Sequence, residues 1–521
     1  MTTWTAGYVA DIGYTHGFYR ELTPALLNFV LLTRGQRGPD LDGRVTYCEL
    51  GCGQGVSTNL LAAANPAIEF HATDFNPAQI AGARALAAEA GTPNVHFYDH
   101  SFAEFLHEPA LPASFDVIAL HGIYSWISPE NRAHIVEFLR RRLKPGGIVY
   151  ISYNTLPGWA AAMPLRRLLT DHAGTRTGPI IPRIDEAVAF AESMREAKAS
   201  YFTQNPALAP RFDKLKALPR SYLAHEYFNR DWTPFYVADV AAELAEAKLT
   251  YVGSAALLEG VDAINLNAEQ QAILKACADP VRRETLRDYM VNQQFRRDVY
   301  VKGALPHTVP SSRAIWTHLR FALSTPRAEV ALKVQGSLGE AQLQEEVYRP
   351  ILDVLARGPA TVQAIFADPS VKALDWGKLM EAFGILVGSG HVQPCPSGKE
   401  PAKEPAKEPA KDEAARLKRT RAFNAAVMKR AEASEELQFL ASPVTGSGVP
   451  ADRMAQLFLS AQAAGVDPVQ RAWAVLQAQG QRLVKDGKPL DGAEANLADL
   501  RERYDTFVAT RLPVFRQLGI A

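Results

Sequence analysis

Short apolar runs and amphipathic segments alternate regularly over the first part of the chain. Apolar runs at 45–50, 95–98, 115–120 and 148–153, together with one that ends just before Asp74, have the length of buried strands. The segments between them predict helices over roughly 56–64, from Pro77 to a stop at Gly91, and from Pro129 onward to a stop at a Lys-Pro-Gly-Gly segment. Strands and helices that alternate with short connections predict an α/β fold, with a parallel sheet covered by helices on both faces.

The connection between the first strand and the first helix is rich in glycine and reads ELGCGQG over 49–55. A dinucleotide site needs a third glycine where this chain has Val56, so the spacing favours a nucleoside ligand without a pyrophosphate, such as S-adenosylmethionine. Asp74 follows at the interval that places an acid beside the ribose hydroxyl groups of such a ligand. The alternative is a tight turn in which glycine serves only to allow positive φ.

The loops after the five strands should meet at one pocket, because ligands of parallel sheets bind outside the carboxyl ends of the strands. Asp99 ends the third strand, where an acid can accept the adenine amino group; the alternative is an aspartate in a surface loop. The predicted cofactor-binding residues are Tyr14, Tyr19, Glu49, Gly51, Cys52, Gly53, Gly55, Asp74, Phe75, Asp99, His100, Ser101 and His121.

Two aromatic loops, HGIYSW at 121–126 and SYNTLPGW at 152–159, follow the fourth and fifth strands. Methyl transfer requires a nucleophile held in line with the methyl group of the donor. A histidine here can act as a base or a hydrogen-bond partner, and aromatic rings can steer an amine by cation–π contact. The alternative is that the rings belong to the core and the histidine is buried. The predicted catalytic residues are His121, Tyr124, Trp126, Tyr153 and Asn154, with Trp159 assigned to the core and no metal ligand.

A loop rich in glycine and tyrosine, at 14–19, precedes a helix that starts at Thr23 and Pro24. This loop either folds back as a lid, with Tyr14, His16 and Tyr19 over the cofactor, or packs its rings beneath a surface helix. The sequence leaves both arrangements open.

The rest of the 521-residue chain is long enough for further domains and changes in character along its length. Helices broken by proline and glycine suggest a cap inserted before the last strands of the sheet, where it would shape the substrate entrance. Residues 348–370 and 380–395 predict helix, turn, helix and an apolar hairpin. The helices of this winged-helix-like module lack a basic face, which favours protein contact or packing over DNA binding.

The motif EPAK occurs three times over 400–411 and predicts an extended linker. A separate helical region follows; its opening segment RLKRTR, at 416–421, either binds phosphate or acidic protein or is a solvated helix start. The predicted organisation is a lid and helix (1–40), a Rossmann-like cofactor-binding core (41–160), a helical cap suited to dimerisation (161–232), a segment that completes the sheet (233–303), a winged-helix-like domain (304–395), the linker (396–412) and a helical C-terminal domain (413–521).

Composition excludes some classes of protein. An apolar content of 47% indicates a globular chain, and equal numbers of basic and acidic residues, 56 each, give no overall attraction to nucleic acid or membrane. The four cysteines lack the spacing of a metal site, so we expect reduced thiols and a cytoplasmic location. No segment has the ~20 apolar residues of a membrane span, and the first residues do not read as an export signal.

The motif ELGCGQG with Asp74 resembles the class I S-adenosylmethionine-dependent methyltransferases. A more specific set, YTHGFYREL, HGIYSW, LKPGG, YISYNTLPGW, YLAHEYF and PFYVADVAAELAEAKLTYVGSA, resembles the subgroup with a methyltransferase regulatory domain, which includes rickettsial-type protein-lysine methyltransferases of outer-membrane protein. The resemblance covers roughly 5–305 and leaves the EPAK linker and the region after it outside. It implies lysine N-methylation of a surface protein by a dimer, with the cofactor at the glycines and acids named above and His121 and Tyr124 at the pocket.

Three functions follow from these observations. The first is S-adenosylmethionine-dependent methylation of protein lysine. The second is N- or O-methylation of a small molecule, which uses the same chemistry in a pocket of different size. The third is a non-catalytic, cofactor-binding regulatory or scaffold protein.

Overall fold

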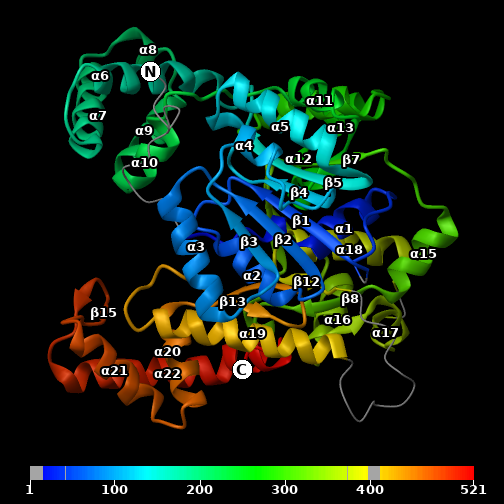
Figure 1. Cartoon of the computed structure of the whole chain (residues 1–521), viewed down its shortest axis with the longest axis vertical. Helices are drawn as coiled ribbons and strands as arrows, with labels where there is room; N and C mark the ends of the chain where they lie inside the picture. Colours follow the sequence, from blue (N-terminus) through cyan, green and yellow to red (C-terminus); the bar gives the residue numbers. More distant parts are fainter. Residues whose placement is uncertain (1–15, 42, 372–373, 397–410) are drawn as a thin grey trace.

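A seven-stranded sheet forms the centre of the molecule (Figure 1). The computed structural model describes residues 16–41, 43–371, 374–396 and 411–521. Strands β1 to β5 are parallel, and β7 lies antiparallel between β5 and β6. In the order in which they lie, the strands are β3 (Val95–Tyr98), β2 (Ile68–Thr73), β1 (Val45–Leu50), β4 (Phe115–Leu120), β5 (Leu143–Asn154), β7 (Phe295–Lys302) and β6 (Leu249–Ser254).

Helices cover both faces of this sheet, as the alternating pattern predicts, and each face has its own hydrophobic cluster. One face carries α1 (Pro24–Thr33), α2 (Val56–Ala64) and α3 (Pro77–Ala90), and the other carries α4 (Phe102–Leu106), α5 (Pro129–Arg142) and α11 (Val237–Ala245). The predicted ends of α3 are confirmed: the Asn76 side chain accepts a hydrogen bond from the Ala78 N–H, and Gly91 has a φ of 60°. The fold is therefore the predicted α/β core.

Strand β5 begins earlier than the sequence predicts. The Lys-Pro-Gly-Gly segment at 144–147 reads as a helix stop, yet it belongs to the strand. Leu143 pairs with Phe115, and a register shift on β4 between Phe115 and Val117 accommodates the extra residues.

The predicted cap is a bundle of short helices that projects from the core and has its own hydrophobic cluster (Figure 1). Trp159 belongs to this cluster, as expected for a core residue. The cap helices are α6 (Met163–Gly174), α7 (Ile180–Glu196), α8 (Ser200–Thr203), α9 (Leu208–Ala217) and α10 (Arg220–Tyr227).

The segment that completes the sheet contains a buried ion network. Arg296 on β7 is paired with Asp288, Asp298 and Glu284; the first three of these four side chains are buried, and that of Glu284 is 18% exposed. Its helices are α12 (Asp262–Asn265), α13 (Ala268–Lys275) and α14 (Pro280–Val291).

The region after β7 differs in part from the predicted helix, turn, helix and hairpin. Met380–Gly388 is not a strand: it belongs to a helix, α18, because Leu379, Phe383 and Leu386 recur at helical spacing and are buried. A short strand, Val392–Pro394, follows and pairs with the distant strand Arg320–Leu323, so residues 380–395 do not form the predicted hairpin. The elements are α15 (Val309–His318), β8 (Arg320–Leu323), β9 (Lys333–Gly336), β10 (Gly339–Gln342), α16 (Glu345–Ala356), β11 (Ala360–Thr361), α17 (Val362–Ala367), α18 (Trp376–Gly388) and β12 (Val392–Pro394), with β11, β8 and β12 in one antiparallel sheet.

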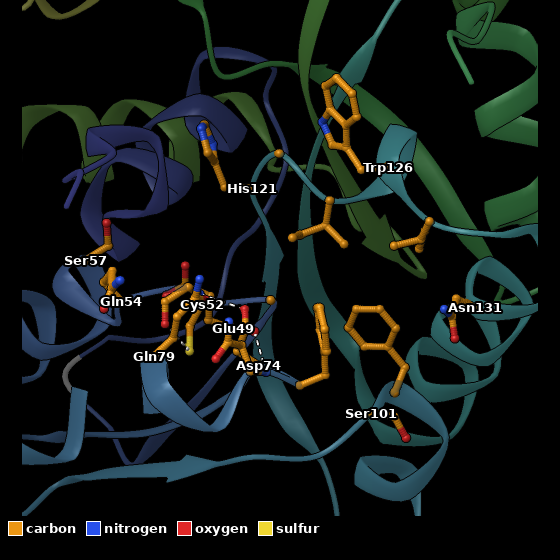
Figure 2. A pocket seen from close by; sticks show the side chains of 18 of the residues that line it. Glu49, Cys52, Gln54, Ser57, Asp74, Gln79, Ser101, His121, Trp126 and Asn131 are labelled. Atoms are coloured by element: carbon orange, nitrogen blue, oxygen red, sulfur yellow. Dashed lines mark hydrogen bonds between the residues drawn. The ribbon is translucent and has the colours of Figure 1, made fainter. Parts of the chain in front are cut away.

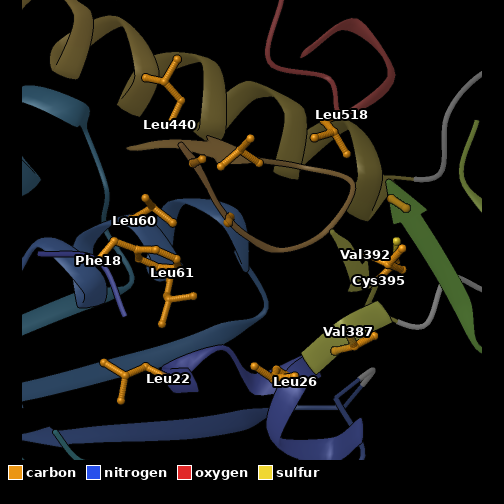
Figure 3. Packing of buried hydrophobic residues seen from close by; sticks show 14 of the residues in the cluster. Phe18, Leu22, Leu26, Leu60, Leu61, Val387, Val392, Cys395, Leu440 and Leu518 are labelled. Carbon is orange, nitrogen blue, oxygen red and sulfur yellow. The ribbon is translucent and has the colours of Figure 1, made fainter. Parts of the chain in front are cut away.

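The C-terminal region packs on the core. The sequence, in contrast, predicts a separate helical region after the linker. Its first helix packs on α2 and α3, and its first hairpin packs on α2. Buried side chains of the hairpin and of α2 belong to one hydrophobic cluster (Figure 3). Asn65 at the end of α2 donates a hydrogen bond to the Gly446 carbonyl, 2.7 Å away. The elements are α19 (Lys411–Arg430), β13 (Phe439–Ser442), β14 (Ser447–Pro450), α20 (Arg453–Ala463), α21 (Pro468–Ala478), β15 (Val484–Lys485), β16 (Lys488–Pro489) and α22 (Gly492–Gln517).

The basic segment at 416–421 is also engaged by the core, since Arg419 donates to the Asn94 side chain at 2.8 Å. Almost all of the EPAK repeat lies outside the described residues. Of the helices within them, none is long and apolar enough to cross a membrane.

Candidate active site

A cavity opens at the carboxyl ends of β1 to β4, where the sequence predicts a pocket (Figure 2). The loops after these strands form its floor, the segment before α1 closes one side, and the loop after α10 reaches the other side. Its lining residues are Gly17, Tyr19, Glu49, Gly51, Cys52, Gly53, Gln54, Val56, Ser57, Asp74, Phe75, Asn76, Gln79, His100, Ser101, Phe102, His121, Gly122, Ile123, Trp126, Ile127, Ser128, Asn131 and Asp231.

The glycine-rich turn after β1 needs all three of its glycines. Gly51, Gly53 and Gly55 have φ of 75°, 53° and 64°, a region that side chains rarely adopt. A Cβ atom on Gly51 would lie 2.4 Å from Ile123, and one on Gly55 would lie 2.6 Å from Ala83. The turn thus presents bare backbone at Gly51 and Gly53, while Gly55 allows α2 to approach α3.

Two buried carboxyl groups lie beside this turn. The Asp74 carboxylate accepts hydrogen bonds from the N–H groups of Gly53 and Asn76, each at 3.0 Å, and burial raises its pKa. Glu49 accepts a hydrogen bond from the Thr58 hydroxyl group, and burial raises its pKa to about 7. Each carboxylate offers about four acceptor positions, so Asp74 keeps capacity for ligand hydroxyl groups.

His121 and Tyr19 stack on each other at one side of the cavity, with ring centroids 3.7 Å apart. The His121 Nδ1 atom lies 2.9 Å from the Tyr150 hydroxyl group. Burial, together with the Arg297 guanidinium, lowers the pKa of His121 to about 3. This histidine is therefore neutral at physiological pH, which suits a hydrogen-bonding role better than that of a general base.

The cap contributes a carboxylate to the opposite side of the cavity. Asp231, in the loop after α10, lines it together with Trp126. The adjacent Trp232 packs against Trp126, with ring centroids 6.3 Å apart, and the Thr233 N–H donates to the Ser125 carbonyl at 2.8 Å. The core thus holds this loop at the cavity.

The charged side chains that line the cavity are acidic. Glu49 and Asp74 line it together with Asp231, whose carboxylate is also paired with Arg230 at 2.8 Å, and among the described residues that line it there is no lysine or arginine. Such a surface favours a cationic ligand, because a sulfonium or ammonium group offsets the buried negative charge. It is a poor site for a pyrophosphate. The bare glycine backbone, the two acids and the apolar rings of Phe75 and Phe102 fit S-adenosylmethionine.

The structure brings most of the predicted site residues together. Those that line the cavity are Tyr19, Glu49, Gly51, Cys52, Gly53, Asp74, Phe75, His100, Ser101, His121 and Trp126. Tyr14 lies outside the described residues. Asp99 points toward α3, where a carboxylate oxygen lies 3.6 Å from Arg84, and Gly55 packs against α3.

Three predicted catalytic residues do not line the cavity. Tyr124 and Tyr153 are fully buried in the core, because their hydroxyl groups find acceptors there in Glu243 and Asp298. Asn154 is buried as well, and its N–H donates to the Ser125 hydroxyl group. For the two tyrosines, the core alternative describes the geometry.

Several lining residues were missed by the sequence analysis: Gly17, Gln54, Val56, Ser57, Asn76, Gln79, Phe102, Gly122, Ile123, Ile127, Ser128, Asn131 and Asp231. Most of them flank predicted residues, and their position in the loops after the strands could have indicated that they line the cavity. Asp231 carried no such signal, because it reaches the cavity from a domain inserted more than a hundred residues after the glycine-rich turn.

Comparisons with known proteins agree with this geometry. A family model described as "Methyltransferase domain" matches residues 48–149, and one described as "Predicted methyltransferase regulatory domain" matches 219–302. An uncharacterized protein of Synechocystis is 46% identical over 519 residues, which cover 100% of each chain. An uncharacterized protein of Rickettsia prowazekii is 27% identical over 294 residues, or 55% of this chain and 51% of the other.

The fold is shared with PKMT2 from Rickettsia typhi, whose structure is known in complex with AdoHcy. The TM-score is 0.69 at 18% identity, over 97% of this chain and 99% of the other. The C-terminal region, which the sequence resemblance leaves out, is therefore part of the shared fold. The methyltransferase match, the cavity and the fold together identify an enzyme that uses S-adenosylmethionine. The chain belongs to the class I S-adenosylmethionine-dependent methyltransferases that carry a methyltransferase regulatory domain.

Proposed function

We propose that the enzyme methylates the side-chain amine of lysine in a protein substrate. One observation carries this proposal: Trp126 and the cap residue Asp231 both line the cavity, with the Asp231 carboxylate also paired with Arg230 at 2.8 Å. A lysine ammonium group is attracted by both, through charge and through the aromatic face.

The cofactor supplies an electrophilic methyl group on a sulfonium centre when it is bound. Its amino-acid part would lie along Gly51 and Gly53 near Glu49, its ribose hydroxyl groups at Asp74, and its adenine between Phe75 and Phe102. The lysine would then enter from the cap side, so that its nitrogen is in line with the methyl group.

The acceptor must lose a proton before it reacts. With a pKa of about 10.4, a lysine costs about 4–5 kcal/mol to present as the neutral amine at pH 7. Desolvation in the cavity lowers this cost, and the proton passes to solvent at the mouth. The amine lone pair then forms the carbon–nitrogen bond as the carbon–sulfur bond breaks. His121, which is neutral, would hold the amine by a hydrogen bond.

The shared fold adds support from a second direction. PKMT2 from Rickettsia typhi, whose structure is known in complex with AdoHcy, has a fold that matches this chain from the core to the C-terminal region. At 18% identity this relationship concerns the fold, so the substrate class rests on the cavity.

A labelling experiment tests the proposal. The full chain is incubated with S-adenosylmethionine carrying a radioactive methyl group and with lysate from a cell that lacks the enzyme, and label is then measured separately in proteins and in small molecules. We expect label in protein, and none with the Asp74→Ala variant.

Two outcomes would contradict the proposal. Label confined to the small-molecule fraction would assign the enzyme to small-molecule N- or O-methylation. Cofactor binding without label in either fraction would favour a regulatory protein that senses the cofactor. Asp185→Asn, which removes an acid of the cap that does not line the cavity, should label protein like the wild type.

A further inference from the structure

A cluster of metal-ligating side chains lies on the sheet away from the cofactor cavity. Glu69 and His71 are on β2, and His96 is on β3. Their three candidate ligand atoms all lie within 4.8 Å of one another. The methyl-transfer site does not use these residues.

The strand register brings the three side chains together. His71 and His96 are paired across the parallel strands, and their ring centroids are 4.8 Å apart. Glu69 precedes His71 by two residues, so it lies on the same face of the sheet. Its carboxylate is hydrogen-bonded to the Nε2 atom of His96. Sequence spacing alone does not reveal the cluster, because the ligands come from two strands.

The cluster is separated from the methyl donor. Glu69 and His96 are near the amino ends of their strands, whereas Asp74 and His100 follow the carboxyl ends. Five residues of extended chain from Glu69 to Asp74 span about 16 Å. A ligand here would therefore not touch the transferred group.

We propose that Glu69, His71 and His96 bind one divalent transition-metal ion of the Zn²⁺ type. Two imidazole nitrogens and one carboxylate oxygen form a ligand set that Zn²⁺ accepts, with water in the remaining position. The side chains of Glu69 and His96 are 45% and 43% exposed, so an ion and its water can enter from solvent.

The ligand atoms must move closer together by up to about 1.4 Å. Zn²⁺ binds nitrogen and oxygen at about 2.0–2.2 Å in a tetrahedral arrangement, so two of its ligands lie about 3.4 Å apart, and the three candidate atoms lie within 4.8 Å of one another. The half-exposed Glu69 and His96 side chains can close this difference by rotation. His71 is anchored: its Nδ1 atom lies 3.3 Å from the Tyr98 hydroxyl group, which leaves Nε2 for the metal. A hydrogen bond of this kind to the second nitrogen orients a metal-binding imidazole.

The bound ion would join β3, the edge strand, to its neighbour β2. Its expected consequence is greater stability of the folded chain, because an ion that binds the folded form alone shifts the unfolding equilibrium. The loops that follow these two strands line the cofactor cavity, although the ion itself takes no part in methyl transfer.

Metal titration of the full chain tests this proposal. The protein is stripped with a chelator and dialysed, then titrated with Zn²⁺ by calorimetry and with Co²⁺ by visible absorption. We expect one ion per chain, the absorption of Co²⁺ in a nitrogen and oxygen site, and a higher melting temperature. His96→Ala and Glu69→Gln should each weaken binding at least about 100-fold, and Tyr98→Phe about 10-fold.

His107→Ala removes an exposed histidine outside the cluster and should leave Zn²⁺ binding unchanged. Binding of the product S-adenosylhomocysteine reports whether each variant is folded, and Glu69→Gln, which changes a half-exposed side chain, serves if His96→Ala does not fold. Failure of Zn²⁺ to bind in a one-to-one ratio would overturn the proposal. Equal affinity in the wild type and both ligand variants would also overturn it, since the cluster would then be only a Glu–His pair on the surface.

Discussion

At the scale of single residues, the buried acids of the cavity control how the cofactor binds. Burial raises the pKa of Glu49 to about 7, so a large fraction of this carboxyl group is protonated in the free enzyme at neutral pH. A cationic ligand favours the ionised form. We therefore predict that S-adenosylmethionine binding releases a proton from Glu49 and becomes tighter as the pH rises from about 6 to 8, which calorimetry in buffers of different ionisation enthalpy measures.

The effect on folding has the opposite sign. Between pH 4.5 and about 7, Glu49 is protonated in the folded chain and ionised in the unfolded chain. The contribution of Glu49 to the free energy of unfolding therefore falls as the pH rises through that range. Glu49→Gln should abolish the proton release and flatten both pH dependences. Proton release that persists in this variant would assign the titration to another group.

Asp231 offers a second prediction for a single residue. The Asp231 carboxylate is paired with Arg230 at 2.8 Å, and its substitution by asparagine removes the charge that we assign to recognition of the substrate amine. Since a hydrogen bond to a charged group contributes about 1.5–3 kcal/mol, the KM for the protein substrate should rise about tenfold or more, with kcat within about threefold of wild type. Steady-state kinetics measures both; a fall in kcat with KM unchanged would contradict the assigned role. Asp185→Asn is the matched control.

The sequence predicts some residues of the cavity correctly and others wrongly. Glu49, Asp74 and the glycines follow from local spacing, because strand, turn and helix adjoin each other in the chain. The sequence predicts Tyr124 and Tyr153 at the pocket because aromatic residues at a strand end are poorly placed for the interior of the sheet. The structure buries them instead, since α11 and β7, both distant in sequence, supply partners for their hydroxyl groups.

At the scale of elements, Gly55 joins the glycine-rich turn to α2. Alanine there would combine positive φ with a Cβ contact of 2.6 Å to Ala83. We predict that Gly55→Ala lowers the free energy of unfolding by about 2–4 kcal/mol, of which strain at positive φ supplies about 1 kcal/mol and overpacking the rest. Urea denaturation measures the loss.

Gly91 provides a matched control for Gly55. Its φ is 60°, yet a Cβ atom would meet no other atom within 4 Å. Gly91→Ala should therefore lower the free energy of unfolding only by the strain at positive φ, about 1 kcal/mol. Equal losses in the two variants would show that close packing of α2 and α3 contributes nothing at Gly55.

The ion network around Arg296 on β7 also makes a testable contribution to the free energy of unfolding. Arg296 contacts the buried carboxylates of Asp288 and Asp298 and the partly exposed carboxylate of Glu284. Replacing it with methionine would leave Asp288 and Asp298 without their cation, whereas Glu284 keeps Arg287, and we predict a loss of about 3–5 kcal/mol in the free energy of unfolding. Arg283→Met, at a side chain 43% exposed, should change stability by less than about 1 kcal/mol. A comparable, small change in both variants would contradict the importance of the buried network.

At the scale of the whole molecule, the C-terminal region supports the cofactor-binding core. Phe439 on its first hairpin packs against Phe18, with ring centroids 5.3 Å apart, and the Thr23 and Ser447 hydroxyl groups are hydrogen-bonded at 2.9 Å. Phe18 lies next to Tyr19, which lines the cavity. The segment that closes the cavity is therefore held from outside by the β13–β14 hairpin of the C-terminal region (Figure 3).

The packing of the C-terminal region on the core cannot be predicted from the sequence. The proline-spaced EPAK repeat indicates a boundary, and a boundary suggests separate domains. Which surface the region beyond it covers depends on packing between residues several hundred positions apart, such as Asn65 and Gly446. Local patterns do not encode such pairs, whereas the strand–helix units of the core are encoded within about 30 residues each.

The most direct test of the proposed activity identifies the atom that receives the methyl group. The protein that becomes labelled is digested and sequenced by tandem mass spectrometry, with unlabelled cofactor and a deuterated methyl donor compared in parallel. Our account predicts methyl groups on the side-chain nitrogen of lysine, and their absence when the enzyme carries Asp74→Ala. Methyl groups on a carboxylate, a hydroxyl group or the protein N-terminus, or none on protein at all, would contradict it.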